Sequence, residues 1–393
     1  MLKLAHKRVA VAILLGAVLV CTSGGFAAAT PSVKASPRLA PASAPCTNAA
    51  AAEAQVAKQW RASEAALGVP YLTPPKEVVC YVTTTKYKKK GLLTIGFASQ
   101  GPTNSWAASS DAYVRYVLAQ NHVSLDYASA NGSGATQVSN VEDLVSEKPD
   151  LLIVQPLSSA VEAGIHRAAQ EGIPVVVCTG ELSDTNDITA TVNHDYALQG
   201  TLFAQWIVKE LHGQGEIAMI SGIAGAPTAE VPYQAALAFF KHYPGIKIMT
   251  HQYDNWSETQ AKTVAASMLV QYPGIKAVWS DSSFTDVGVA QAYTAAHKAI
   301  PIVTGDSSNA FLRVAKQYHM TFALSSYPPE QCGMAVSVAI QILEGKTVLN
   351  QVQVPNAVYT QTQLGKYYRA NCSDNLWVPS LLPEPILKQL DLC

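Results

Sequence analysis

Polar and aromatic side chains recur in this sequence directly after short apolar segments. Such runs include Ser99 to Trp106, Asp254-Asn255-Trp256 and Asp306-Ser307-Ser308. Carboxylates and amides can hydrogen-bond the hydroxyl groups of a neutral polyhydroxylated molecule, and flat rings can cover its C–H faces. One Ser or Asn in such a place is more often a turn or helix cap. Their repetition at the same point of the pattern predicts a binding site for a small polar ligand.

Motifs for catalysis are missing from the sequence. It has no Gly-x-Ser-x-Gly, no His-Glu-x-x-His and no Cys-x-x-Cys. Gly345-Lys346-Thr347 ends like a phosphate-binding loop, but Ile340 occupies the position where that loop needs glycine. The carboxylates of Asp281 and Asp306 could perform acid–base chemistry in principle. We nevertheless expect a protein that is not an enzyme and that uses neither a cofactor nor a metal.

The apolar segments set the fold class. We expect strands at 93–98, 123–129, 150–155, 174–178, 189–193, 216–221, 246–252, 276–280, 301–305 and 320–325. Most are continuous apolar runs, which is typical of parallel strands covered on both faces. Amphipathic helical segments such as 197–211 separate them. The alternation predicts an α/β protein with two doubly wound parallel-sheet lobes that divide near residue 194.

Composition limits the class of protein. The 393 residues are 49% hydrophobic and 14% charged, enough apolar material for one large or two medium domains. The formal net charge is −1 and no basic stripe is present, so we expect no nucleic-acid partner.

The N-terminus predicts export. Residues 1–29 combine an early basic group, an apolar run at 9–20 and the small-residue site Ala27-Ala28-Ala29, the pattern of a cleaved secretory signal. Lipidation at Cys21 is the alternative. Residues 30–90 are interpreted as a linker and N-terminal extension, and 366–393 as a C-terminal tail.

Six cysteines remain after removal of the predicted signal, an even number that suits disulfides in an exported chain. Six cysteines allow 15 pairings. Proximity favours Cys46–Cys80 and Cys372–Cys393. Cys178 ends an apolar strand, and burial alone could explain it.

Several motifs together carry a family resemblance. In chain order they are Ile95-Gly96-Phe97 with Asn104-Ser105-Trp106, Asp150 to Pro156, Gly172 to Val175, Gly222-Ile223-Ala224-Gly225, Ala277 to Ser280, Gly305-Asp306 and Pro329 to Gly333. The region from about 92 to 355 therefore resembles the ribose/galactose-type (type I) periplasmic binding proteins, whose fold is shared by the effector lobes of lactose-repressor-like regulators. The N-terminus carries an export signal where such a regulator has a DNA-binding headpiece.

The resemblance implies two lobes joined by a three-strand hinge. The crossings would fall near 194, 326 and 351. Lobe 1 would comprise 91–194 and 326–350, and lobe 2 would comprise 195–325 and 351–365. By analogy the ligand-binding residues are expected to be Ser99, Asn104, Trp106, Thr179, Trp256, Ser282, Asp306 and Tyr327, with Tyr327 at the hinge.

The resemblance also implies a role. We expect a monomeric, exported receptor that captures a small solute, a sugar or polyol, and delivers it to the membrane permease of an ABC importer. A ligand sensor that docks on a chemoreceptor or sensor kinase is the alternative.

The sequence departs from the sugar-binding pattern at two places. Thr179-Gly180 stands where many relatives carry Asp-Arg, and no arginine lies near Glu230. A less common polyol, a nucleoside, or a cationic or partly apolar ligand that meets Glu181 or Glu230 therefore stays open.

Overall fold

A computed structural model describes residues 47–48, 50–70, 79–354 and 356–393. The predicted signal at 1–29, Cys21 within it, the segment 30–46 and Cys46 lie outside the described residues. Within the described part of the chain, no helix has the length and apolar character that a membrane span requires.

The first of two six-stranded sheets has the order β14-β7-β6-β5-β3-β4, with every neighbouring pair parallel. Its strands are β3 (Thr94–Ser99), β4 (Ser124–Ser129), β5 (Leu151–Val154), β6 (Val175–Cys178), β7 (Ala190–Asn193) and β14 (Gln351–Gln353). Successive side chains of a strand point to opposite faces. Accordingly, Ile153 packs with α2 (Ser105–Gln120) and α10 (Gln331–Leu343), and Leu152 packs with α3 (Gly134–Glu147) and α4 (Glu162–Gln170).

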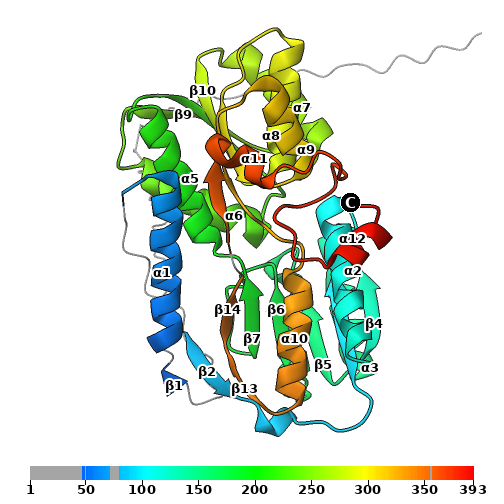
Figure 1. Cartoon of the computed structure of the whole chain (residues 1–393). Coiled ribbons are helices and arrows are strands. Elements are labelled where there is room, and N and C mark those ends of the chain that lie inside the picture. The colour runs from blue at the N-terminus through cyan, green and yellow to red at the C-terminus, as the bar shows by residue number, and fades with distance from the viewer. Residues whose placement is uncertain (1–46, 49, 71–78, 355) are drawn as a thin grey trace, which may run out of the picture. The chain divides into compact units, whose positions relative to one another are not determined.

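The second sheet has the order β15-β12-β11-β10-β8-β9, parallel except for β15, which pairs antiparallel with β12. Its strands are β8 (Gly215–Ser221), β9 (Ile246–Tyr253), β10 (Ile275–Ser280), β11 (Ile302–Asp306), β12 (Phe322–Ser325) and β15 (Val358–Thr360). One face is covered by α5 (Tyr196–Glu210) and α6 (Pro227–Phe240), and the other by α7 (Glu258–Gln271), α8 (Ser283–Ala295) and α9 (Asn309–Tyr318). We call the two sheets with their helices lobe 1 and lobe 2 (Figure 1).

The predicted fold class and all ten predicted strands are confirmed, with their ends shifted by at most two residues. The third crossing differs from the prediction at 351. Gln351–Gln353 pair with β7 in the first sheet, and the chain reaches the second sheet only at Val358–Thr360. The crossing is later because β14 first extends the first sheet as its edge strand beside β7.

The N-terminal extension contributes packed structure. Helix α1 (Ala50–Leu67) is rich in alanine, a strong helix former, and its Trp60 is buried against α5. The Trp60 indole N–H donates to Asp195 Oδ2 at 2.9 Å. Farther along, β2 (Cys80–Thr83) pairs with β13 (Thr347–Leu349) and with the short β1 (Thr47–Asn48). Part of the 30–90 segment thus belongs to the folded body.

Two disulfides join described residues, Cys372–Cys393 and Cys178–Cys332. The first is the pairing that proximity favoured. Cys80 is also disulfide-bonded. Cys178, for which burial alone was considered, is buried and bonded as well: it ties the end of β6 to α10 across 154 residues.

We predict that the Cys178–Cys332 bond contributes more to stability than Cys372–Cys393. The entropy that a disulfide removes from the unfolded chain grows with the loop it closes, here 154 against 21 residues. The double change Cys178→Ala/Cys332→Ala should lower the unfolding free energy by about 2–5 kcal/mol in urea titrations. Cys372→Ala/Cys393→Ala is the matched control, and an equal or larger loss there would contradict the argument.

Candidate ligand-binding cleft

A cavity of about 50 Å³ lies where the carboxyl ends of strands from both sheets meet. Its lining residues are Gln100, Asn104, Trp106, Thr179, Tyr196, Gln199, Thr228, Trp256, Asp281, Ser282, Phe284, Asp306, Tyr327 and Trp377. They come from both lobes, from the crossings between them and from the C-terminal tail. Six of these side chains are aromatic and two are carboxylates. None of the described lining residues is a lysine, arginine or histidine.

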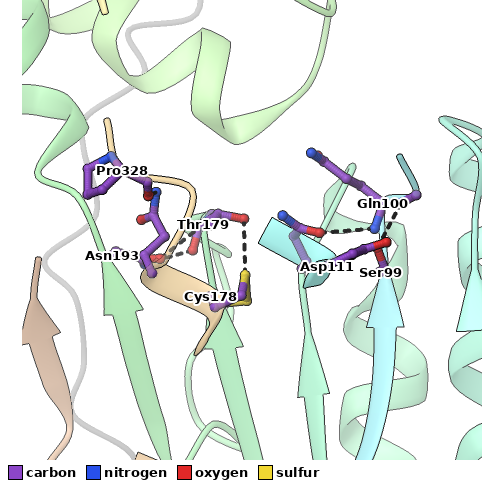
Figure 2. The surroundings of a disulfide bond; sticks show 12 residues. Ser99, Gln100, Asp111, Cys178, Thr179, Asn193 and Pro328 are labelled. Atoms are coloured by element: carbon purple, nitrogen blue, oxygen red, sulfur yellow. Dashed lines mark hydrogen bonds between the residues drawn. A yellow bond between two sulfur atoms is a disulfide. The ribbon is translucent and has the colours of Figure 1, made fainter. Parts of the chain in front are cut away.

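The structure brings together seven of the eight predicted site residues around this cavity and leaves Ser99 out. Ser99 is fully buried at the end of β3. Its hydroxyl donates to Asp111 Oδ1 at 2.7 Å and accepts the Gly101 N–H at 2.9 Å. Figure 2 shows this pairing beside Gln100, the neighbour that lines the cavity. Ser99 therefore holds the loop after β3, and Gln100 takes the lining position.

Lobe 1 presents Asn104 and Trp106 at the start of α2. Asn104 caps that helix by accepting the Ala107 N–H at 2.9 Å, so it is a helix cap and a lining residue at once. The Trp106 ring stacks on Tyr327 with centroids 4.9 Å apart, and its N–H donates to the Tyr327 carbonyl at 2.8 Å. Trp106 is thereby fixed to the crossing that follows β12.

A cluster of rings lies where two of the crossings between the sheets meet the cavity. The hydroxyls of Tyr196 and Tyr327 lie 3.0 Å apart, and His194 makes edge contacts with both rings. Burial lowers the pKa of His194 to about 3, so this imidazole is neutral at ordinary pH. Burial also raises the pKa of both tyrosines. The contacts between the crossings are therefore made by uncharged aromatic side chains.

Lobe 2 presents Trp256 against a glycine. Trp256 follows β9, and its indole N–H donates to Asp281 Oδ1 at 3.2 Å. The other oxygen of Asp281 accepts the Gly222 N–H at 3.2 Å. A Cβ at Gly222 would fall 1.8 Å from the Trp256 ring, so the ring can lie in this place only because residue 222 is glycine.

The lobe 2 wall concentrates buried carboxyls. Asp306 accepts the Ser283 N–H, and the neighbouring Ser282 caps α8 by accepting from Phe284 N. Burial raises the pKa of Asp306 to about 7 and that of Asp254 to about 6. For Asp281, burial and then the charge of Asp254 raise the pKa well above its usual range. None of the described lining residues is a cation that could stabilise these carboxyls in their ionised form. A ligand that donates hydrogen bonds to their oxygens would provide that stabilisation.

Two lining residues have left-handed backbone, Thr179 with φ of 56° and Trp256 with φ of 50°. Such conformations are costly for residues other than glycine and gather at functional sites. Thr179 directly follows the disulfide-bonded Cys178, as Figure 2 shows. The amide of Asn193 also fixes this turn through hydrogen bonds to both the N–H and the carbonyl of Gly180.

Several lining residues were not among those predicted. Gln100 and Asp281 lie in loops that directly follow strands, and they could have been chosen there, whereas Thr228 lies in the first turn of α6. Tyr196 and Gln199 lie in the first turn of α5, and Phe284 lies in the first turn of α8. Trp377 comes from the tail, and no sequence pattern connects it with the cleft.

The fold and the cavity together define a class of protein. Two α/β lobes enclose a small site of carboxylates, amides and rings at the carboxyl edges of their sheets, which is the arrangement of a two-lobed solute receptor. Residues 95–347 match the periplasmic binding protein domain, and the chain belongs to that family. It is a family of solute-binding proteins rather than enzymes, and membership implies an exported protein.

Curated relatives and solved structures agree with this assignment. The ribose import binding protein of Bacillus subtilis is 23% identical over 270 residues, which cover 68% of this chain and 87% of that protein. The D-allose-binding periplasmic protein of Escherichia coli is 28% identical, over 51% of this chain and 68% of that one. An ABC transporter solute-binding protein from Bacillus halodurans with bound myo-inositol superposes with a TM-score of 0.66 at 19% identity, covering 71% of this chain and 98% of that chain.

We predict a pH-dependent stability that depends on Asp306. Between its unfolded pKa near 3.8 and its folded pKa of about 7, the folded protein holds a proton that the unfolded chain has lost. The stabilising contribution is therefore fully present below about pH 3.8 and is lost as the pH rises through 7, at up to about 1.4 kcal/mol per pH unit. Asp306→Asn removes the titrating group.

The measurement is the difference in unfolding free energy between wild type and Asp306→Asn, from urea titrations at pH 4.5 and pH 7.5. Relative to the variant, wild type should be less stable at the higher pH. The contribution of His194 has the opposite sign, because its pKa is lowered, and it cancels in the difference. A difference that does not change with pH would contradict the burial argument.

Proposed function

We propose that this protein captures a small neutral polar solute, a sugar or polyol, in the cleft and delivers it to the membrane permease of an ABC importer, acting as an exported monomer. The observation that carries the proposal is the lining of the cavity. Two carboxylates, amides and six aromatic rings meet there, and none of the described lining side chains is basic. The names of the relatives support the ligand class, since they include a ribose import binding protein, a D-allose-binding protein and a xylitol-binding protein.

The charges of the cleft argue against anionic ligands. A phosphate or carboxylate in proteins is commonly met by arginine, lysine or a helix N-terminus. None of the described residues that line the cavity is a lysine, arginine or histidine, so an anion would meet no positively charged side chain there. Hydroxyl groups of a neutral ligand can donate to the carboxyl oxygens of Asp281 and Asp306, and hydrogen bonds to charged groups contribute about 1.5–3 kcal/mol each. Asp281 and Asp306 would thus serve as the polar anchors in place of the missing Asp-Arg pair.

The mechanism we infer is closure of the two lobes about the crossings. The chain passes between the sheets after β7, after β12 and after β14. A ligand that contacts Trp106 on one side and Asp306 on the other makes both sets of contacts only when the lobes are close together. It stabilises that arrangement by its difference in affinity for the two states. The permease would then recognise the closed form.

We predict that Trp256→Ala and Asp306→Ala each weaken ligand binding at least tenfold without unfolding the protein. Each removes a lining side chain, the ring face in one case and the hydrogen-bond acceptor in the other. Affinity is measured by calorimetry on a ligand found by a thermal-shift screen of sugars, polyols, nucleosides, amino acids and aromatic acids. A ligand at 100 times its Kd should add about 2.7 kcal/mol of stability.

Tyr318→Ala is the matched control, because this aromatic side chain is 41% exposed on α9 and does not line the cavity. Its affinity should equal that of wild type. Unchanged affinity in both site variants would remove the cleft as the binding site, and a screen in which only non-carbohydrates bind would replace the proposed ligand class.

A further inference from the structure

The C-terminal segment 369–393, here called the strap, lies beyond the family match at 95–347 yet is part of the folded body. Five of its apolar side chains are at most 6% exposed and pack in cores of the protein: Leu376, Trp377, Val378, Leu382 and Leu392. The Cys372–Cys393 disulfide closes the segment on itself. A loose appendage would not bury these side chains, so the strap has a fixed position.

Lobe 2 holds the first part of the strap through the start of α9. The fully buried Asn309 donates from Nδ2 to the carbonyls of Arg369, Cys372 and Ser373. Its backbone N–H donates to the Leu376 carbonyl at 2.8 Å. Ser308 and Trp377 also pair as an antiparallel bridge. The strap thus lies against the loop between β11 and α9, next to Asp306.

Lobe 1 holds the next part through a single carboxylate. Glu330 immediately precedes α10 and is fully buried. Its Oε1 accepts hydrogen bonds from Ser380 Oγ at 2.7 Å, Leu381 N at 2.9 Å and Leu382 N at 3.1 Å. The strap therefore passes from lobe 2 to lobe 1 over the few residues between 376 and 382.

Trp377 lies in that short passage. It is 3% exposed, lines the cavity, and meets Phe284 of lobe 2 edge to face with centroids 5.5 Å apart. The same small apolar cluster contains Trp106 of lobe 1. A residue from outside the family domain thus forms part of the wall of the cleft.

The indole donors of the cleft are not equivalent. The Trp106 N–H donates to the Tyr327 carbonyl and the Trp256 N–H donates to Asp281. The Trp377 N–H is buried and, within the described structure, has no acceptor. Buried donors are nearly always satisfied, and one left open at a binding cavity indicates an acceptor that arrives from outside.

We propose that Trp377 is a ligand-contact residue, supplied to the cleft by the strap, whose N–H donates to an oxygen of the bound solute. The assignment rests on the proposed function of the cleft and narrows its ligand. Asp281 and Asp306 receive the ligand's donors, and Trp377 requires an acceptor oxygen on the side of the cavity facing the strap. A compact sugar ring or cyclitol offers both, whereas a simple amine offers no such acceptor.

The test compares Trp377→Phe with wild type by calorimetry, using D-ribose, D-allose, xylitol and myo-inositol as probes. Phenylalanine keeps an aromatic ring in the strap but lacks the donor. We expect at least tenfold weaker binding of the probe that wild type binds. Lys388→Ala is the control within the strap, because this lysine is exposed and pairs with the equally exposed Glu384 of the same short helix. Its affinity should not change.

Deoxy analogues of the bound probe separate a contact from a structural role. If the N–H donates to one oxygen, the analogue that lacks this oxygen should bind wild type and Trp377→Phe equally, whereas other deoxy analogues should retain the tenfold difference. A uniform loss for all analogues would overturn the contact and leave Trp377 with packing alone.

The failures are distinguishable. If a probe binds wild type and Trp256→Ala weakens it while Trp377→Phe does not, the receptor function stands and the strap contact is wrong. If wild type binds none of the sugars or polyols, the proposed function fails, and the assignment of Trp377 to such a ligand fails with it. Melting temperatures of both variants close to that of wild type exclude unfolding as the cause of a loss.

Discussion

Burial of both faces of each parallel sheet is the constraint on which the rest of this structure depends. Strands such as β5 and β6 have no exposed residue, because helices cover each side. Polar chemistry is therefore excluded from the strands themselves and confined to their ends. Since parallel strands all end at one edge, loops that are far apart in sequence meet there, and the two edges together form the cleft.

The crossings must connect the lobes without breaking this burial. They do so with aromatic and neutral polar groups rather than charges. Tyr327 is central, since its carbonyl receives Trp106, its ring stacks on that indole and its hydroxyl meets Tyr196. These contacts join the crossings without a buried ion pair, whose charges would strongly resist separation.

The repeated pattern of the chain made most of the fold predictable. Most strands are continuous apolar runs, so the loops after them could be located from the sequence. The family resemblance then singled out Trp256, Ser282 and Asp306 in those loops. The sequence could not show whether Ser99 or Gln100 lines the cleft, because the conformation of the turn determines which of two adjacent side chains faces it. The Cys178–Cys332 pair and Trp377 lay beyond prediction for a different reason. Both depend on contacts between segments that are far apart in the sequence and meet only in the folded protein, and no local sequence pattern predicts such contacts.

The Cys178–Cys332 disulfide can form only after a large part of the chain has been synthesised. Its two cysteines belong to lobe 1, but the whole of lobe 2 up to β12 is synthesised between them. Lobe 2 is nearly contiguous in sequence, whereas lobe 1 must wait for α10 before its own helix layer is complete. The covalent bond can therefore form only after the chain has passed through lobe 2 as far as β12 and has returned to lobe 1. Once formed, it keeps the strands of lobe 1 attached to α10 even if one crossing is cut.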